Sequence, residues 1–109
     1  MPSIAVTISR FVNEHQPGIV ECILVDALGS SHLFVEKVPI VTIENLVPTS
    51  SYPCNGAIAC EILATWQDES TGRSVARVST EQPWGVESTT GETTFVVLSS
   101  QLTGIESGA

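Results

Sequence analysis

Short apolar stretches run along the whole chain, and in most of them every second residue is large and hydrophobic. A period of two is typical of a β-strand with one buried face, because successive side chains of a strand point to opposite sides. The composition agrees with this pattern, since Val and Ile together number 22 whereas Ala and Leu together number 14. Because β-branched residues favour strands, we expect a fold built almost entirely of strands.

Turn residues divide the apolar stretches from one another. The predicted strands cover residues 3–11, 19–26, 32–37, 38–43, 57–66, 74–80 and 93–98. The strand at 19–26 is apolar on both faces and is therefore predicted to be central. Pro39 has no N–H for a β-ladder, so the segment 38–43 is predicted to be an edge strand or a bend. At most one helical turn is expected, at residues 43–46.

The first predicted hairpin has a tight turn at residues 28–29. That turn would place Cys22 opposite Val35 and Leu24 opposite Leu33 on one face. It would also place Glu21 opposite Glu36, which is mildly unfavourable because like charges repel.

The second predicted hairpin joins residues 57–66 to residues 74–80 through the loop 67–72. Its register would place Ile62 opposite Val78 and Ala64 opposite Ala76 on the core face, and Arg77 near Glu61 on the outer face. From the two hairpins we expect six residues to be buried together: Cys22, Leu24, Val35, Cys60, Ile62 and Val78.

These strands predict an all-β fold without crossover helices. The expected architecture is a small antiparallel, partly open β-barrel of the OB- or SH3-like kind, with about six or seven strands. A hydrophobic content of 42% is high enough for a packed core. Residues 1–103 are predicted to form this single domain, and residues 104–109 a flexible C-terminal tail.

The charge of the chain limits its partners. Twelve acidic and four basic side chains give a net charge of −8. Nucleic acids and anionic membranes attract clusters of Lys and Arg, so neither is expected to be a partner of this acidic chain. A neutral or basic protein is the expected partner. The chain has no secretory signal pattern and an odd number of cysteines. A cytoplasmic location with three reduced thiols is therefore expected.

Sequence motifs for catalysis are not found, so no catalytic residue, cofactor or metal is predicted. Cys22 and Cys60 are interpreted as small core residues, and Cys54 is the cysteine expected to meet solvent. A zinc site of His15, His32, Cys54 and Cys60 is conceivable, but its spacing matches no usual zinc motif.

Two long loops carry the candidate partner-binding residues. Trp84 stands between Pro83 and Gly85 in the loop 81–92, and Tyr52 stands in the loop 44–56. Rigid exposed aromatic residues are common binding anchors, although the Trp84 indole would alternatively fold back to close one end of the barrel. If the two loops lie at the same end, they would form one concave aromatic patch. The carboxylates of Glu81, Glu87 and Glu92 would then rim this patch.

The leading hypothesis is a non-enzymatic, acidic interaction module that binds a neutral or basic protein through the loops 44–56 and 81–92. An inhibitor or immunity-type protein is one concrete version, because opposite charges speed association. The alternative is a small enzyme or ligand-binding barrel with a pocket at the loop end, using His32, Glu36 or Cys54 as polar groups. The shortage of acid and base pairs favours the first hypothesis.

Overall fold

The computed structural model describes residues 1–14 and 18–104. Within these residues, eight strands form two antiparallel sheets. The first sheet has the order β3 (Ser31–Lys37), β2 (Ile19–Val25), β1 (Ser3–Asn13) and β4 (Cys54–Ala59), with β8 (Leu102–Thr103) also paired to β1. The second sheet has the order β5 (Glu61–Gln67), β6 (Ser74–Ser79) and β7 (Thr94–Leu98).

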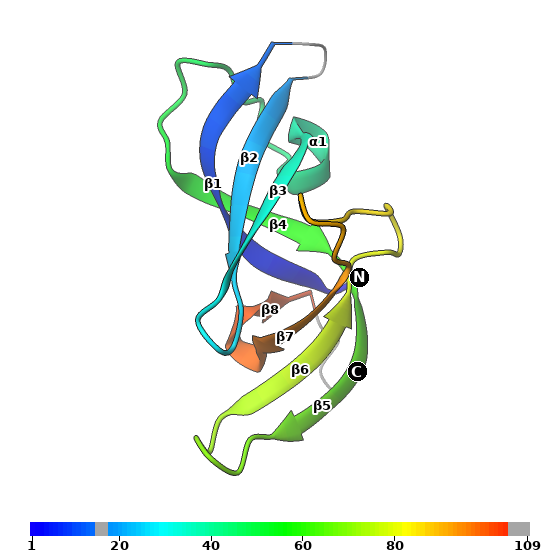
Figure 1. The fold of residues 1–109 in the computed structure, drawn as a ribbon. Helices are drawn as coiled ribbons and strands as arrows, with labels where there is room; N and C mark the ends of the chain where they lie inside the picture. Colours follow the sequence, from blue (N-terminus) through cyan, green and yellow to red (C-terminus); the bar gives the residue numbers. More distant parts are fainter. Residues whose placement is uncertain (15–17, 105–109) are drawn as a thin grey trace.

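The two sheets lie one above the other along the long axis of the molecule (Figure 1). The long strand β1 pairs with β4 through residues 3–8 and with β2 through residues 7–13. Neither sheet closes on itself, so the predicted all-β, antiparallel and partly open fold is confirmed. The structure adds η1 (Ser99–Gln101) and the short strand β8, which the sequence pattern did not predict. No helix in the described part of the chain is long and apolar enough to cross a membrane.

One hydrophobic core lies between the two sheets. The inward residues of β1, β2 and β4 pack there against Ala76, Val78, Phe95 and Val97 of the second sheet. Cys22, Leu24, Cys60 and Val78 are fully buried as predicted, and Ile62 is partly buried against this core. The prediction is wrong for Val35, whose side chain is 45% exposed.

Val35 is exposed because the β2–β3 register differs from the predicted one by one residue. Cys22 lies opposite Phe34, and Leu24 lies opposite His32. A shift of one residue moves every side chain of a strand to the other face. Phe34 therefore enters the core in place of Val35, and Glu21 lies opposite Val35 rather than Glu36.

The turn itself explains this shift. The backbone N–H of Asp26 donates to the carbonyl of Ser30, so three residues, not two, form the loop. The third of them, Gly29, has a φ of +83°, which glycine adopts without steric cost. The Asp26 carboxylate accepts hydrogen bonds from the N–H groups of Leu28 and Ser30 and so holds this three-residue turn in place.

The predicted strand 57–66 is divided between the two sheets. It breaks at Cys60, whose N–H donates to the carbonyl of Pro2. The predicted pair of Ile62 and Val78 is confirmed, but a bulge at Leu63 then places Ala64 opposite Arg77 instead of Ala76. Arg77 does not pair with Glu61, because its guanidinium lies over the ring of Trp66.

The predicted edge strand or bend around Pro39 is one turn of helix, α1 (Val38–Val41). Pro39 lies in the first turn, where its missing N–H costs no hydrogen bond. This helical turn therefore comes before the predicted position at 43–46, and η1 is a second one that was not predicted. The loop that follows ends at Cys54, where β4 begins. Of the predicted tail, only Gly104 belongs to the described residues, and 105–109 lie outside them.

Candidate functional site

The loop between β6 and β7 is fixed at its base by buried polar contacts. The Thr80 side chain is fully buried, and its hydroxyl donates to the carbonyl of Val86 at 2.6 Å. The N–H of Val86 donates in turn to the carbonyl of Thr80 at 3.0 Å. The Val86 side chain is 1% exposed and belongs to the core. The base of this loop is therefore part of the folded core.

Trp84 lies on the turn that this base supports. The turn is closed by the N–H of Gly85, which donates to the carbonyl of Glu81 at 2.7 Å. Gly85 has a φ of +64°, a conformation that side chains disfavour. The Trp84 side chain is 62% exposed, and Glu81 and Glu87 on either side of it are exposed as well. The alternative prediction, in which the indole folds back into the barrel, is therefore wrong.

Tyr52 has different surroundings. Its ring is half-buried and packs against the core, and its hydroxyl donates to the carbonyl of Val47 at 2.7 Å. Its loop lies beside the upper ends of β1 and β2, whereas the β6–β7 loop lies on the other side of the molecule near the end of β6 (Figure 1). The condition for a single aromatic patch was that both loops lie at the same end of the barrel. They do not, so Tyr52 and Trp84 do not form such a patch.

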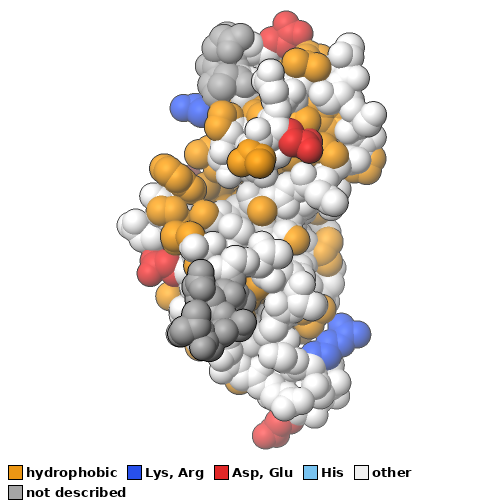
Figure 2. Space-filling model, turned by 180° about the vertical axis from the view of Figure 1, so that it is seen from behind, with side chains coloured by type: hydrophobic (Ala, Val, Ile, Leu, Met, Phe, Trp, Pro, Cys, Tyr) orange, Lys and Arg blue, Asp and Glu red, His pale blue; other side chains and the backbone are white. Residues whose placement is uncertain are grey.

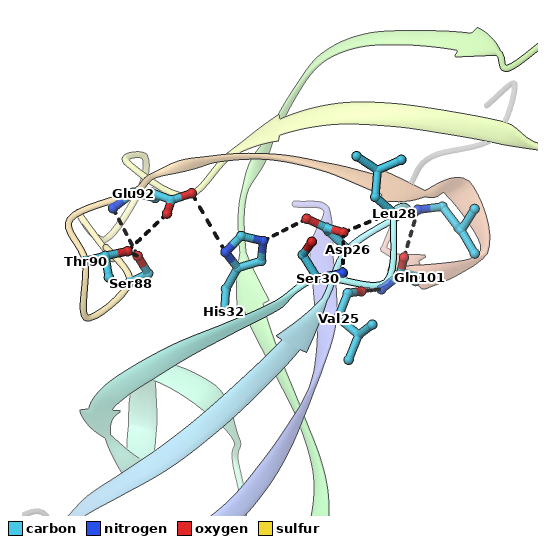
Figure 3. Close-up of polar contacts among 10 residues, drawn as sticks. Val25, Asp26, Leu28, Ser30, His32, Ser88, Thr90, Glu92 and Gln101 are labelled. Carbon is cyan, nitrogen blue, oxygen red and sulfur yellow. Dashed lines mark hydrogen bonds and ion pairs between the residues drawn. The ribbon is translucent and has the colours of Figure 1, made fainter.

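A histidine lies between two carboxylates where the β2–β3 turn meets the second sheet (Figure 3). The Nε2 atom of His32 is 2.8 Å from an oxygen of Asp26, and its Nδ1 atom is 3.8 Å from an oxygen of Glu92. The His32 ring also packs edge-on against Phe95 of β7, with 4.9 Å between ring centroids. His32 is the second residue of β3, and its side chain is partly exposed, at 16%.

Hydrogen bonding favours the charged form of Asp26. Burial raises the pKa of its carboxyl group, but hydrogen bonds from His32 and from the N–H groups of Ser30 and Leu28 outweigh burial. The pKa of Asp26 therefore lies below its usual value, and the group is a carboxylate at neutral pH.

Glu36 has the opposite shift. Its side chain points inward from β3 and is half-buried. Burial raises the pKa of its carboxyl group above the usual value; the charge of Lys37 lowers it, and that of Glu87 raises it further. The half-buried Glu36 carboxylate is thus a source of instability at neutral pH.

The three cysteines are unpaired. Burial raises the pKa of the Cys22 thiol to about 12 and that of Cys60 to about 11, so both are protonated and unreactive at neutral pH. Cys54 is half-buried, and burial together with the charge of Glu44 raises its pKa. His15, one member of the conceivable zinc site, lies outside the described residues. Within them, no group of three His, Cys, Asp or Glu side chains is placed to hold a metal ion.

A shallow hollow of about 380 Å³ lies between α1 and β4, with apolar walls formed by Pro39, Ile40, Ala57 and Ala59. The polar groups His32, Glu36 and Cys54 do not line it. Elsewhere, on the face seen in Figure 2, hydrophobic side chains are spread over the middle and upper part, and basic side chains are sparse. The hollow offers an apolar contact surface without acid and base groups.

Sequence reasoning found Trp84 and the glutamates of its loop, Glu92 included. It missed that Thr80 holds this loop at its base, and that Asp26 and Glu92 lie on either side of His32. Asp26 had a local signal, because Asp just before a short glycine-containing turn often binds the backbone of that turn. The contact of Glu92 with His32 had no such signal, since the two residues lie far apart along the chain.

Comparison of the chain with protein-family models, with curated proteins and with solved structures found no match.

Proposed function

We propose that this protein is a non-enzymatic interaction module whose β6–β7 loop binds a neutral or basic protein partner. Trp84 is the anchor of the interaction, and Glu81 and Glu87 provide negative charge beside it. The unpaired cysteines suit a reducing, cytoplasmic setting. An inhibitor or immunity-type protein against a basic target is one form that such a module takes.

The contrast between Trp84 and Val86 is the observation that carries this proposal. The same turn buries Val86 almost completely and leaves the larger indole 62% exposed. An exposed Trp side chain forgoes about 2 kcal/mol or more of burial free energy. Because hydrogen bonds fix the turn on both sides of Val86, little ordering would be needed before Trp84 enters a pocket of a partner.

The charge distribution supports a basic partner. The chain has a net charge of −8, and Glu81 and Glu87 are both exposed on the same loop as Trp84. Arg10, one of the four basic side chains, is already paired with Glu21, and a second, Arg77, covers Trp66. A Lys or Arg of the partner would find both carboxylates and an aromatic face at this loop.

The loop that contains Tyr52 has a smaller part in this proposal. The Tyr52 ring packs on the core and its hydroxyl is bound to Val47, so it offers less free surface than Trp84. Exposed Val47 gives this loop one apolar contact. We assign it a supporting contact or a separate one, because the two loops lie apart (Figure 1).

The alternative function, a small enzyme or ligand-binding barrel, has less support. The hollow between α1 and β4 contains none of the titratable groups that the alternative requires. Within the described residues, no hydroxyl or thiol is hydrogen-bonded to the His32 ring, which instead lies between two carboxylates. A nucleophile next to its base is the usual sign of covalent catalysis.

A cross-linking experiment tests the proposed surface. An aromatic photoreactive amino acid, which keeps a ring at the anchor position, replaces Trp84 in one variant and Trp66 in another. Each protein is then irradiated in cells of its natural host. Trp66 is the matched control because it is 40% exposed but covered by Arg77. We expect one defined adduct from position 84, none from position 66, and a weaker adduct when Glu81 and Glu87 are replaced by Gln. Equal adducts from both positions, or none from either, would refute the proposal.

A further inference from the structure

One nitrogen of His32 has a fixed role. Its Nε2 atom lies 2.8 Å from Oδ2 of Asp26. A carboxylate only accepts hydrogen bonds, so Nε2 must carry the proton of this contact. The other oxygen of Asp26 accepts from Leu28 and Ser30, and the ring of Phe95 packs against the imidazole. The position of the ring and the site of its first proton are therefore fixed.

The other nitrogen faces a group that can move. Nδ1 lies 3.8 Å from Oε2 of Glu92, which is too long for a hydrogen bond. With its single proton on Nε2, the imidazole presents a lone pair to a negative oxygen. A second proton on Nδ1 would convert this contact into a charge-assisted hydrogen bond. The Glu92 side chain is 51% exposed and that of Asp26 is 14% exposed, so Glu92 is the partner that can approach.

Glu92 belongs to a hydrogen-bonded segment of the β6–β7 loop. Its N–H donates to the Ser88 hydroxyl, and its carboxylate accepts from the Thr90 hydroxyl, both at 3.0 Å (Figure 3). The N–H of Thr89 in the same segment donates to the carbonyl of Leu33 on β3 at 2.8 Å. Glu92 and Thr89 therefore belong to one hydrogen-bonded segment that ties this loop to β3.

We propose that His32 is a proton-dependent latch, in which the second proton of its ring tightens the attachment of the β6–β7 loop to the β2–β3 hairpin. Asp26 and Glu92 are the charged groups that face His32 among the described residues. Glu36, four residues further along β3, interacts with Lys37 and Glu87 instead. The latch would make the loop more rigid when the ring holds both protons. The consequence for partner binding rests on the function proposed above for Trp84.

Amide hydrogen exchange tests the latch directly. The protection of the Thr89 and Glu92 amides, corrected for the intrinsic pH dependence of exchange, is compared at about pH 8 and pH 5, the range in which histidines gain a second proton. In the parent we expect protection to rise about two- to five-fold at the lower pH, the size of a half-exposed ion pair. Glu92→Gln should abolish the rise. Glu81→Gln is the matched control, because it removes an exposed charge from the same loop and should retain the rise in protection.

Three results would overturn the latch: an unchanged protection in the parent, the same rise in Glu92→Gln, or the same rise in His32→Gln. If His32→Gln does not fold, Glu92→Gln still tests the latch, because the Glu92 side chain is exposed. Fluorescence anisotropy of Trp84 in a Trp66→Phe background gives a second readout, since the chain has two tryptophans. Neither measurement needs a partner, so failure of the latch and failure of Trp84 docking are distinguishable.

Discussion

The buried hydroxyl of Thr80 donates to the carbonyl of Val86 across the base of the β6–β7 loop, at 2.6 Å. This bond lies within the core, since both side chains are almost fully excluded from water. It joins the place where β6 ends to the residue that brings the loop back into the core. The exposed turn with Trp84 lies between these two residues.

Replacing Thr80 with Val should therefore destabilise the fold. Val has nearly the same shape but cannot donate, so the carbonyl of Val86 would lose its side-chain donor. We expect a loss of about 1–3 kcal/mol in the free energy of unfolding, measured by urea denaturation. Thr80→Ser keeps the hydroxyl and should retain more of the stability than Thr80→Val. Equal losses in the two variants would show that the methyl group and not the hydrogen bond is important.

The cysteines should differ sharply in reactivity. With pKa values raised by burial to about 12 and about 11, Cys22 and Cys60 should resist a thiol reagent in the native protein at about pH 8, whereas Cys54 reacts slowly. Denatured protein should show three free thiols. Glu44→Gln should speed the labelling of Cys54, because the charge of Glu44 raises the pKa of that thiol. Labelling of Cys22 as fast as Cys54 would contradict its place in the core.

Glu36→Gln should stabilise the protein at neutral pH. Burial raises the pKa of Glu36 in the folded state, so the folded protein holds this proton more tightly than the unfolded chain. Below the unfolded pKa both states are protonated and there is no penalty; as pH rises through the folded pKa, stability falls. The melting temperature of Glu36→Gln should therefore exceed that of the parent at about pH 7, and their difference should shrink towards about pH 4.

Glu87→Gln gives the control for this effect. It removes the charge that raises the pKa of Glu36 further, so it should reproduce part of the gain with Glu36 still present. Parallel melting profiles of Glu36→Gln and the parent across this pH range would mean that the Glu36 carboxylate is not disfavoured in the fold.

The sequence predicted the strands and the exposed loop better than it predicted the register. Both faces of β2 are apolar, with Val20 and Leu24 on one side and Ile19 and Ile23 on the other, so the pattern fits two pairings with β3. The length of the turn decides between them, and the Asp26 side chain sets that length. Because the register of a hairpin depends on one or two turn residues, an error of one residue in the predicted turn length changes the partner of every residue in the strand.

A similar limit applies to the site. The proline and glycine beside Trp84 predicted an aromatic residue on a tight turn, which the structure contains. Whether the indole or Val86 enters the core depends on Thr80 and on the packing of two sheets, and a local pattern does not encode either. The contact of His32 with Glu92 depends on the same packing.

Two neighbouring residues of β3 test the observed register. Phe34 is fully buried and Val35 is 45% exposed. Phe34→Ala should cost about 3–5 kcal/mol of stability, as removal of a buried aromatic ring typically does. Val35→Ala should change stability by no more than about 0.5 kcal/mol. Chemical denaturation of both variants measures the difference, and a larger loss at Val35 would restore the pairing of Cys22 with Val35.

Trp84→Ala should leave the fold nearly intact. The indole is 62% exposed, and the turn beneath it is held by the backbone and by Thr80, not by the indole. We expect the melting temperature to fall by no more than about 4–8 °C, which corresponds to about 1 kcal/mol in a domain of this size. Binding of the partner should weaken by about 1–2 kcal/mol or more, as for other aromatic anchors.

Trp66→Ala is the control for this pair of effects. It removes the ring that Arg77 covers and should leave partner binding unchanged, because Trp66 lies on β5 and not on the β6–β7 loop. Calorimetry gives the melting temperatures. Titration with the partner that the cross-linking experiment identifies gives the affinities. If Trp84→Ala costs about 3–5 kcal/mol of stability, as loss of a core aromatic does, the indole supports the fold, and the exposed apolar surface near Val47 becomes the better candidate for the binding site.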